Sequence, residues 1–165
     1  MTYYVGVPLV VLGALIEASV LPLFRIAGLQ PNLVLVILVA WLMVRGSSEA
    51  FVLIPIGGVV LGLTESAPLG TALIALAPIA LLHDLHGAHL REGGIIPAVA
   101  FTVLMTVVFH LVYLLAYTVS GQSGDWIGAF LRVTVPACLL NVIVLLPTYL
   151  ILSGLNQESR RPGYV

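Results

Sequence analysis

Long apolar blocks, broken by very little polar sequence, are the feature that most restricts how this chain can fold. Hydrophobic residues make up 61% of the 165 residues and charged residues 8%, too few polar side chains to cover a water-facing surface. The blocks lack the alternation of an outer-membrane barrel strand, so lipid is the expected solvent and helix the expected structure. The six blocks run approximately from 4 to 24, 31 to 44, 50 to 63, 68 to 82, 95 to 119 and 127 to 152.

The predicted fold class is therefore all-α: a polytopic membrane protein with six transmembrane helices in one domain, residues 1–165. The first, fifth and sixth blocks have the ~20 residues that a span needs. The middle three have about 14 each, or roughly 21 Å of helix for a ~30 Å hydrocarbon core. Two arrangements stay open for residues 50–82: two thin spans, or one re-entrant hairpin with its tip at 64–70.

The arginines predict an orientation, because positive residues accumulate on the cytoplasmic side of a membrane protein. Both arrangements place four arginines on the side of the termini and two on the other side. The tail 153–165 and both termini are therefore predicted to be cytoplasmic. The start of the chain has no basic region before its apolar run, which favours an uncleaved first segment over a signal peptide. The terminal side receives Arg45, Arg91, Arg160 and Arg161, and the other side Arg25 and Arg132.

Several function classes are excluded by composition. The chain has six arginines, no lysine and a net charge of −1, so it has no basic field for nucleic acid and no lysine for a phosphate-binding P-loop. It contains no G-x-S-x-G nucleophile motif. The single cysteine, Cys138, lies in an apolar run and suits a small packed side chain. We therefore predict a protein that is not an enzyme and has no cofactor.

Four potential metal ligands lie close together between the fourth and fifth blocks. They are His83, Asp84, His86 and His89, of which the three histidines would share one face of a helix, but further ligands from other helices are missing except for His110. The sequence has no H-E-x-x-H motif. A hydrated loop at the lipid headgroups is the preferred interpretation, and no metal site is predicted.

Polar residues inside the apolar blocks need partners, because an unpaired polar group in lipid costs several kcal/mol. We single out Glu17, His110 and Asn141. Hydrogen bonds between helices are the preferred interpretation for all of them. For Glu17, a contact with another protein and a ligand or proton site also remain open. Gly58 and Gly62 form a G-x-x-x-G pair, which lets a second helix approach closely, either within the chain or from a partner.

Two stretches, QPNLVLVILVAWLMVRG at 30–46 and IPIGGVVLGLTESAPLG at 54–70, resemble the MreD family of bacterial rod-shape determination. That family has Asp where this chain has Gly62, so a role for the family's acid transfers to Glu65 instead. The Pro-Leu-Gly end of the second stretch also suits a turn between helices. The matching residues are Pro31, Asn32, Arg45, Gly46, Gly58, Gly62, Pro68, Leu69 and Gly70.

The resemblance implies a non-enzymatic scaffold in the bacterial cytoplasmic (inner) membrane. Its implied partners are an MreC-like membrane protein and, through it, an elongation complex with RodA, a class-B penicillin-binding transpeptidase and MreB. It also implies a bundle like that of the S-components of vitamin transporters. A small-ligand-binding transporter subunit is therefore the alternative function. The outer loops alone offer few polar residues for such a pocket, mainly Gln30, Asn32, Gln122, Asp125 and Trp126.

Overall fold

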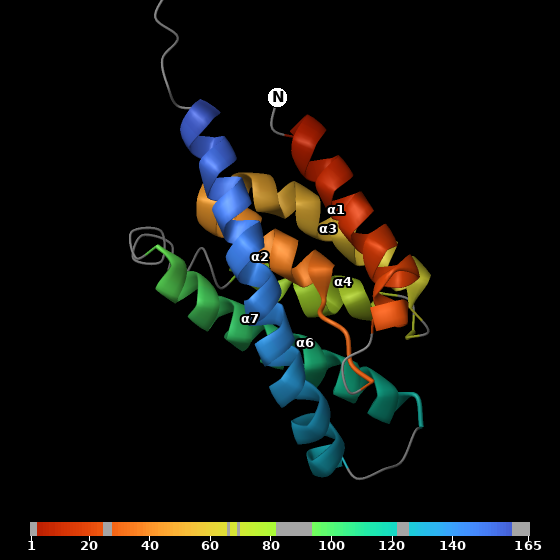
Figure 1. Cartoon of the computed structure of the whole chain (residues 1–165). Helices are drawn as coiled ribbons and strands as arrows, with labels where there is room; N and C mark the ends of the chain where they lie inside the picture. The colour runs from red at the N-terminus through yellow and green to blue at the C-terminus, as the bar shows by residue number, and fades with distance from the viewer. Residues whose placement is uncertain are drawn as a thin grey trace, which may run out of the picture.

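The structure, a computed structural model, describes residues 3–24, 28–65, 67–68, 70–81, 94–121 and 126–159. These residues form six α-helices and one 3-10 helix, with no β-strand among them, which confirms the predicted all-helical class (Figure 1). Each of the six predicted blocks contains a helix. The elements are α1 (Tyr3–Ser19), η1 (Leu21–Phe24), α2 (Leu33–Arg45), α3 (Ser47–Thr64), α4 (Thr71–Leu76), α6 (Ile95–Val119) and α7 (Trp126–Ser159).

Three regions are long and apolar enough to cross a membrane: Tyr4–Leu23, Ile95–Val119 and Trp126–Leu155. They coincide with the blocks for which spanning length was predicted. Between 22% and 33% of the residues in their most apolar windows are buried, so most of each surface faces outward. Figure 1 places the start of α1 and the end of α7 at the same end of the molecule.

Two predicted boundaries need correction. α3 has 18 residues, from Ser47 to Thr64, and is about 27 Å long, so it is less short than the predicted 50–63. It gains its first turn because Gly46, at φ 102°, ends α2 and lets the next helix start at once. α7 continues to Ser159, so residues 153–159 are helix and not the start of a tail.

The centre of the fold is α2, which packs against α1, α3, α6 and α7. Ten consecutive residues, from Val34 to Met43, are buried. A helix that is buried on every side needs no polar face, which explains why its sequence is apolar all round. At 13 residues α2 is short, and its amino end is completed by protein groups, described below.

The two helices after it, α3 and α4, form a hairpin that depends on glycine at two places. Gly70 has φ 89° in the connection, a left-handed conformation that favours glycine, and starts α4. Gly58 is buried, and a Cβ added to it would lie 2.7 Å from Leu73 Cα in α4. The close approach that the G-x-x-x-G pair predicted therefore occurs within the chain. The idea that a partner helix packs on Gly58 is wrong for this structure, because α4 fills that face.

Candidate functional site: an acidic and aromatic cavity

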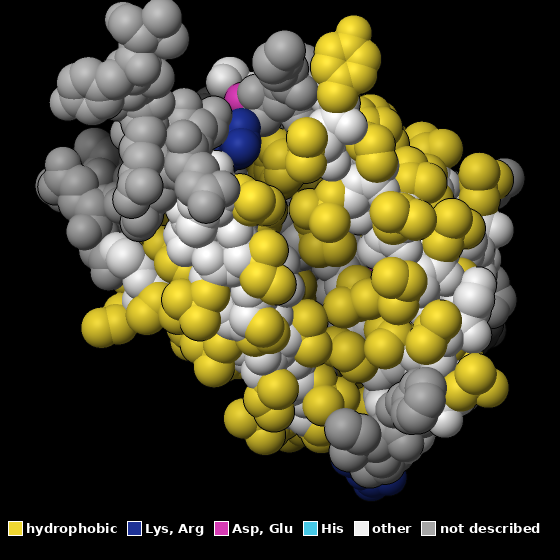
Figure 2. All heavy atoms as spheres, turned by 45° about the horizontal axis from the view of Figure 1, so that its top comes forward, with side chains coloured by type: hydrophobic (Ala, Val, Ile, Leu, Met, Phe, Trp, Pro, Cys, Tyr) yellow, Lys and Arg dark blue, Asp and Glu magenta, His cyan; other side chains and the backbone are white. Residues whose placement is uncertain are grey.

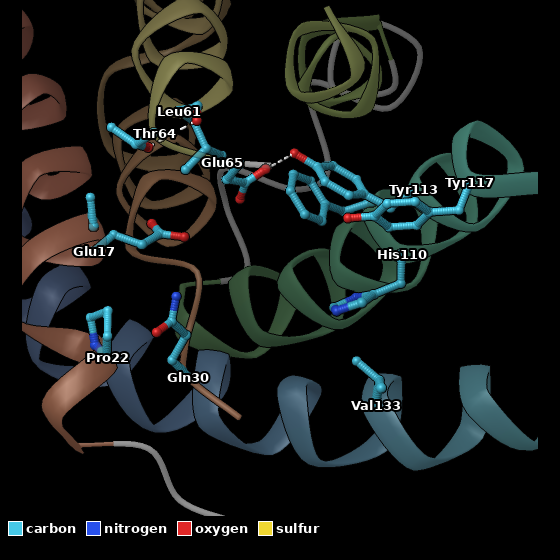
Figure 3. A pocket seen from close by; sticks show the side chains of 12 residues that line it. Glu17, Pro22, Gln30, Leu61, Thr64, Glu65, His110, Tyr113, Tyr117 and Val133 are labelled. Carbon is cyan, nitrogen blue, oxygen red and sulfur yellow. Dashed lines mark hydrogen bonds between the residues drawn. The ribbon is translucent and has the colours of Figure 1, made fainter. Parts of the chain in front are cut away.

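A cavity of about 520 Å³ lies between α1, the segment before α2, the end of α3, α6 and α7 (Figure 3). It brings together side chains from five separate parts of the sequence. Its lining residues lie toward the carboxyl ends of α1, α3 and α6. Its lining residues are Glu17, Ala18, Pro22, Gln30, Leu61, Thr64, Glu65, Phe109, His110, Tyr113, Tyr117 and Val133.

Glu17 joins α1 to the amino end of α2. Its Oε2 accepts a hydrogen bond of 3.1 Å from the backbone N–H of Val34, and the residue is 5% exposed. A carboxylate at this position also suits the partial positive charge of a helix amino end. The predicted hydrogen bond between helices is therefore confirmed. Figure 3 shows the carboxyl group pointing from α1 into the cavity.

Glu65 joins the end of α3 to α6. The Tyr113 hydroxyl donates a hydrogen bond to Glu65 Oε2 (Figure 3). Glu65 also caps α3, since its backbone N–H donates to Leu61 O at 3.1 Å. The acid to which the family resemblance transferred a role is thus half-buried in the cavity wall, opposite Glu17 (Figure 3).

His110 differs from its prediction, because the bond that it makes lies within its own helix. Its Nδ1 lies 2.8 Å from Thr106 O in α6. A carbonyl only accepts, so Nδ1 is the protonated nitrogen of this pair and Nε2 of the neutral ring is left as an acceptor. The ring lines the cavity (Figure 3). The hydrogen bond between helices expected here is made instead by the neighbouring Thr106, described below.

An aromatic wall along α6 forms one side of the cavity. Phe109, Tyr113 and Tyr117 repeat every four residues, so they share one helix face. The rings of Phe109 and Tyr113 stack at 4.5 Å between centroids, and those of Tyr113 and Tyr117 meet edge-on at 6.4 Å. This wall was not predicted from the sequence, although the spacing of four residues indicates a shared helix face.

Gln30 supplies an unpaired polar atom to the same cavity. Its Oε1 is buried and has no hydrogen-bond partner among the described residues. A buried acceptor without a partner is costly, so it marks a place where a donor would be stabilised. The amide lies below Glu17 in Figure 3. Gln30 was noted in the sequence only as a loop residue, because nothing in the pattern showed that the loop turns inward.

A smaller apolar cavity of about 150 Å³ adjoins the first one between α6 and α7. The two share His110, Tyr113, Tyr117 and Val133 in their walls. Phe130 and Leu114 make the smaller cavity apolar. The combined space therefore has an acidic part and an apolar part.

Asn141 is the centre of a separate buried network that holds the bundle together. Its Oδ1 accepts from the Asn32 backbone N–H at 2.8 Å, and its Nδ2 donates to Thr106 Oγ1 at 2.9 Å. These bonds join α7 to the start of α2 and to α6, which confirms the predicted hydrogen bonding between helices. Asn32 in turn caps α2, with its Oδ1 accepting from Leu35 N at 2.7 Å.

The remaining residues of the family-like motif have structural positions outside the cavity. Arg45 lies over the Trp41 ring, 5.1 Å from its centroid, and Trp41 Nε1 donates to Glu49 at 3.0 Å. Pro31 is buried beside Asn32, and Pro68 O accepts from Thr71 N in the turn before α4. Gly62 lies near Ala72 of α4. Leu69 and the predicted histidine loop, from His83 to His89, lie outside the described residues.

The described part of the cavity combines acidic and aromatic side chains. Within the described ranges no three metal-ligating side chains come together. The polar groups of the described lining are acids, an amide, hydroxyl groups and the imidazole of His110 around an aromatic wall, and none of these described lining residues is arginine or lysine. No family model, curated protein or solved structure matches the chain.

Proposed function

We propose that this protein is a non-enzymatic scaffold of a bacterial inner membrane, which binds an MreC-like partner in the machinery of cell-wall elongation. The apolar outer surface of the three span-length helices carries the membrane part of this proposal. The partner and the pathway are supported by the resemblance of residues 30–46 and 54–70 to the MreD family.

The outer surface of the molecule supports insertion in lipid. Figure 2 shows hydrophobic side chains over most of one face, with charged side chains only at its upper and lower ends. On α7 alone, an exposed stripe at every fourth residue includes Leu131, Val135, Leu139 and Ile143. Patches of this extent are rare on water-soluble monomers and need lipid or protein to cover them.

Paired cysteines test the topology. In a Cys138→Ala background, Ser48→Cys and Ser120→Cys place one exposed thiol in the first turn of α3 and one after α6. The arginine distribution predicts that a membrane-impermeant maleimide labels Ser120→Cys in intact cells, and Ser48→Cys only after lysis. Labelling of both positions from outside, or the reverse pattern, would contradict the proposed orientation.

Partner binding is tested by co-purification of the tagged full chain with an MreC-like protein co-expressed from the same organism. We expect a stoichiometric complex that survives Glu65→Gln, because the partner meets the lipid-facing helices and not the cavity. A photo-crosslinker at Leu139 of α7, compared with one at the buried Leu145, distinguishes an outer-face contact from non-specific capture. Absence of the partner from the purified complex would count against the scaffold function.

A second candidate function, a ligand-binding subunit of a membrane transporter, is favoured by one specific observation. The cavity gathers polar and aromatic side chains that the outer loops alone did not supply, and about 520 Å³ lies within the ~300–1,000 Å³ typical of small-molecule sites. In the proposed topology it lies toward the outer side of the membrane. Co-purification of an ATPase module, in place of an MreC-like protein, would support this candidate over the scaffold.

A further inference from the structure

The charge of the cavity is unbalanced, and this is the starting point for identifying what it binds. Two carboxyl groups, those of Glu17 and Glu65, face the same space from α1 and α3 (Figure 3). The chain has no lysine, and neither arginine within the described segments, Arg45 or Arg132, is in the lining. Two acids that share a low-dielectric site favour a positive charge between them.

Hydrogen-bonding groups in the wall point to the same conclusion. Gln30 Oε1 is an acceptor without a partner, and Nε2 of the neutral His110 ring is an acceptor as well. Two hydroxyl donors of the wall are already used, since Thr64 Oγ1 donates to Leu61 O at 2.9 Å and Tyr113 donates to Glu65. A ligand that donates hydrogen bonds therefore fits this wall better than one that accepts them.

The aromatic wall adds a surface for a cation that carries apolar groups. The faces of tyrosine and phenylalanine rings attract ammonium groups, the more so when water is excluded. The adjoining apolar cavity of about 150 Å³, lined by Phe130 and Leu114, extends the space beyond these rings. A ligand with a charged head and an apolar part would fill both cavities.

We propose that this cavity binds an organic ammonium ion, with its charged group between Glu17 and Glu65 and its apolar part against the rings of α6. This inference rests on the ligand-binding function of the cavity and is independent of the partner. The ammonium group can belong to a soluble amine or to a lipid headgroup that enters between helices. The chemistry of recognition is the same in both cases.

The test is calorimetric binding to the purified full chain in detergent, with benzylammonium, which has N–H donors for the acceptors of the wall, and choline as probes. The neutral control is 3,3-dimethylbutan-1-ol, which has the shape of choline without its charge. We expect the two cations to bind with Kd below roughly 1 mM, and the alcohol at least about tenfold more weakly. Equal binding of choline and the alcohol, or no binding of either cation to the folded protein, would overturn the proposal.

Single-residue variants test whether the cation binds in this cavity. Glu65→Gln should weaken cation binding by about tenfold or more, which corresponds to ~1.4 kcal/mol of lost charge interaction. Glu17→Gln should do the same and stay folded, because an amide oxygen still accepts the Val34 N–H bond. Glu49→Gln is the matched control, since Glu49 bonds to Trp41 and lies outside the lining. Wild-type affinity in both cavity variants would refute the site.

Native mass spectrometry separates the two sources of the ammonium group. Displacement of a co-purified amino-phospholipid by benzylammonium supports a lipid headgroup, and binding to lipid-free protein supports a soluble amine. A tightly held anionic or neutral molecule in the cavity would contradict the cationic assignment, while leaving ligand binding as such intact. Failure of the ligand-binding function itself is a separate result: no small molecule of any charge binds, and no ATPase module co-purifies.

Discussion

Gly58→Ala is expected to lower the free energy of unfolding by about 2 kcal/mol, and Gly58→Leu by more, because the added atoms meet backbone. A Cβ at this position would lie 2.7 Å from Leu73 Cα and 3.2 Å from Leu73 Cβ. Overpacking of a close contact typically costs 1–3 kcal/mol, and here the main chain of α4 must move for it to be relieved. Unfolding by SDS in mixed micelles, followed by circular dichroism, measures the loss.

Gly62→Ala is the matched control in the same helix. Its added Cβ would lie 3.8 Å from Ala72 Cβ, which is an ordinary contact. Alanine also favours helix over glycine by roughly 1 kcal/mol, so the expected effect is neutral or slightly stabilising. If the two alanine variants lost stability equally, α3 and α4 would not pack as described.

Asn141→Leu is expected to cost roughly 2–3 kcal/mol, since one side chain serves two other helices. Its removal leaves the buried Asn32 N–H without its acceptor and Thr106 Oγ1 without a donor. An unsatisfied buried group costs ~1–3 kcal/mol in water-soluble proteins, and bonds between membrane helices average ~0.6 kcal/mol each. The same SDS titration measures this loss in the free energy of unfolding.

Thr106→Val distinguishes the contributions of the two hydrogen bonds that the Asn141 side chain makes. It removes the bond to Asn141 Nδ2 and keeps the one to Asn32, so a smaller loss of about 1 kcal/mol is expected. In the double variant the losses should be less than additive, because both changes remove the same bond. Strict additivity would mean that Asn141 and Thr106 are not coupled.

Hydrophobic block lengths were enough to predict the helices. Each block long enough to span coincides with a span-length helix, and the polar residues Glu17 and Asn141 form the bonds between helices that burial in an apolar environment requires. The pattern did not separate a short helix in the interior from a short helix in thin membrane. α2 is a short helix in the interior, with ten consecutive buried residues. Its burial depends on the helices packed around it, which the sequence of α2 alone does not reveal.

The cavity was harder to foresee, because its residues are far apart in sequence and individually ordinary. The bond between Tyr113 and Glu65 spans 48 positions, and Gln30 turns inward from a connecting segment. A pattern in one helix, such as the aromatic repeat from Phe109 to Tyr117, indicates a shared face but not what that face meets. The glycine pair had the same ambiguity, and the packing of α4 on Gly58 resolves it.

The amino end of α2 has a consequence for how the protein is made. Two backbone N–H groups at this end are bound by side chains that are synthesised at very different times. Glu17, which accepts from Val34 N–H, precedes α2, and Asn141, which accepts from Asn32 N–H, follows 109 residues after Asn32. Chains emerge amino end first, so α2 enters the bundle while the Asn32 N–H still lacks its final acceptor. The amino end of α2 is therefore complete only once the last helix has packed, and a chain truncated before Asn141 leaves the buried Asn32 N–H without this acceptor.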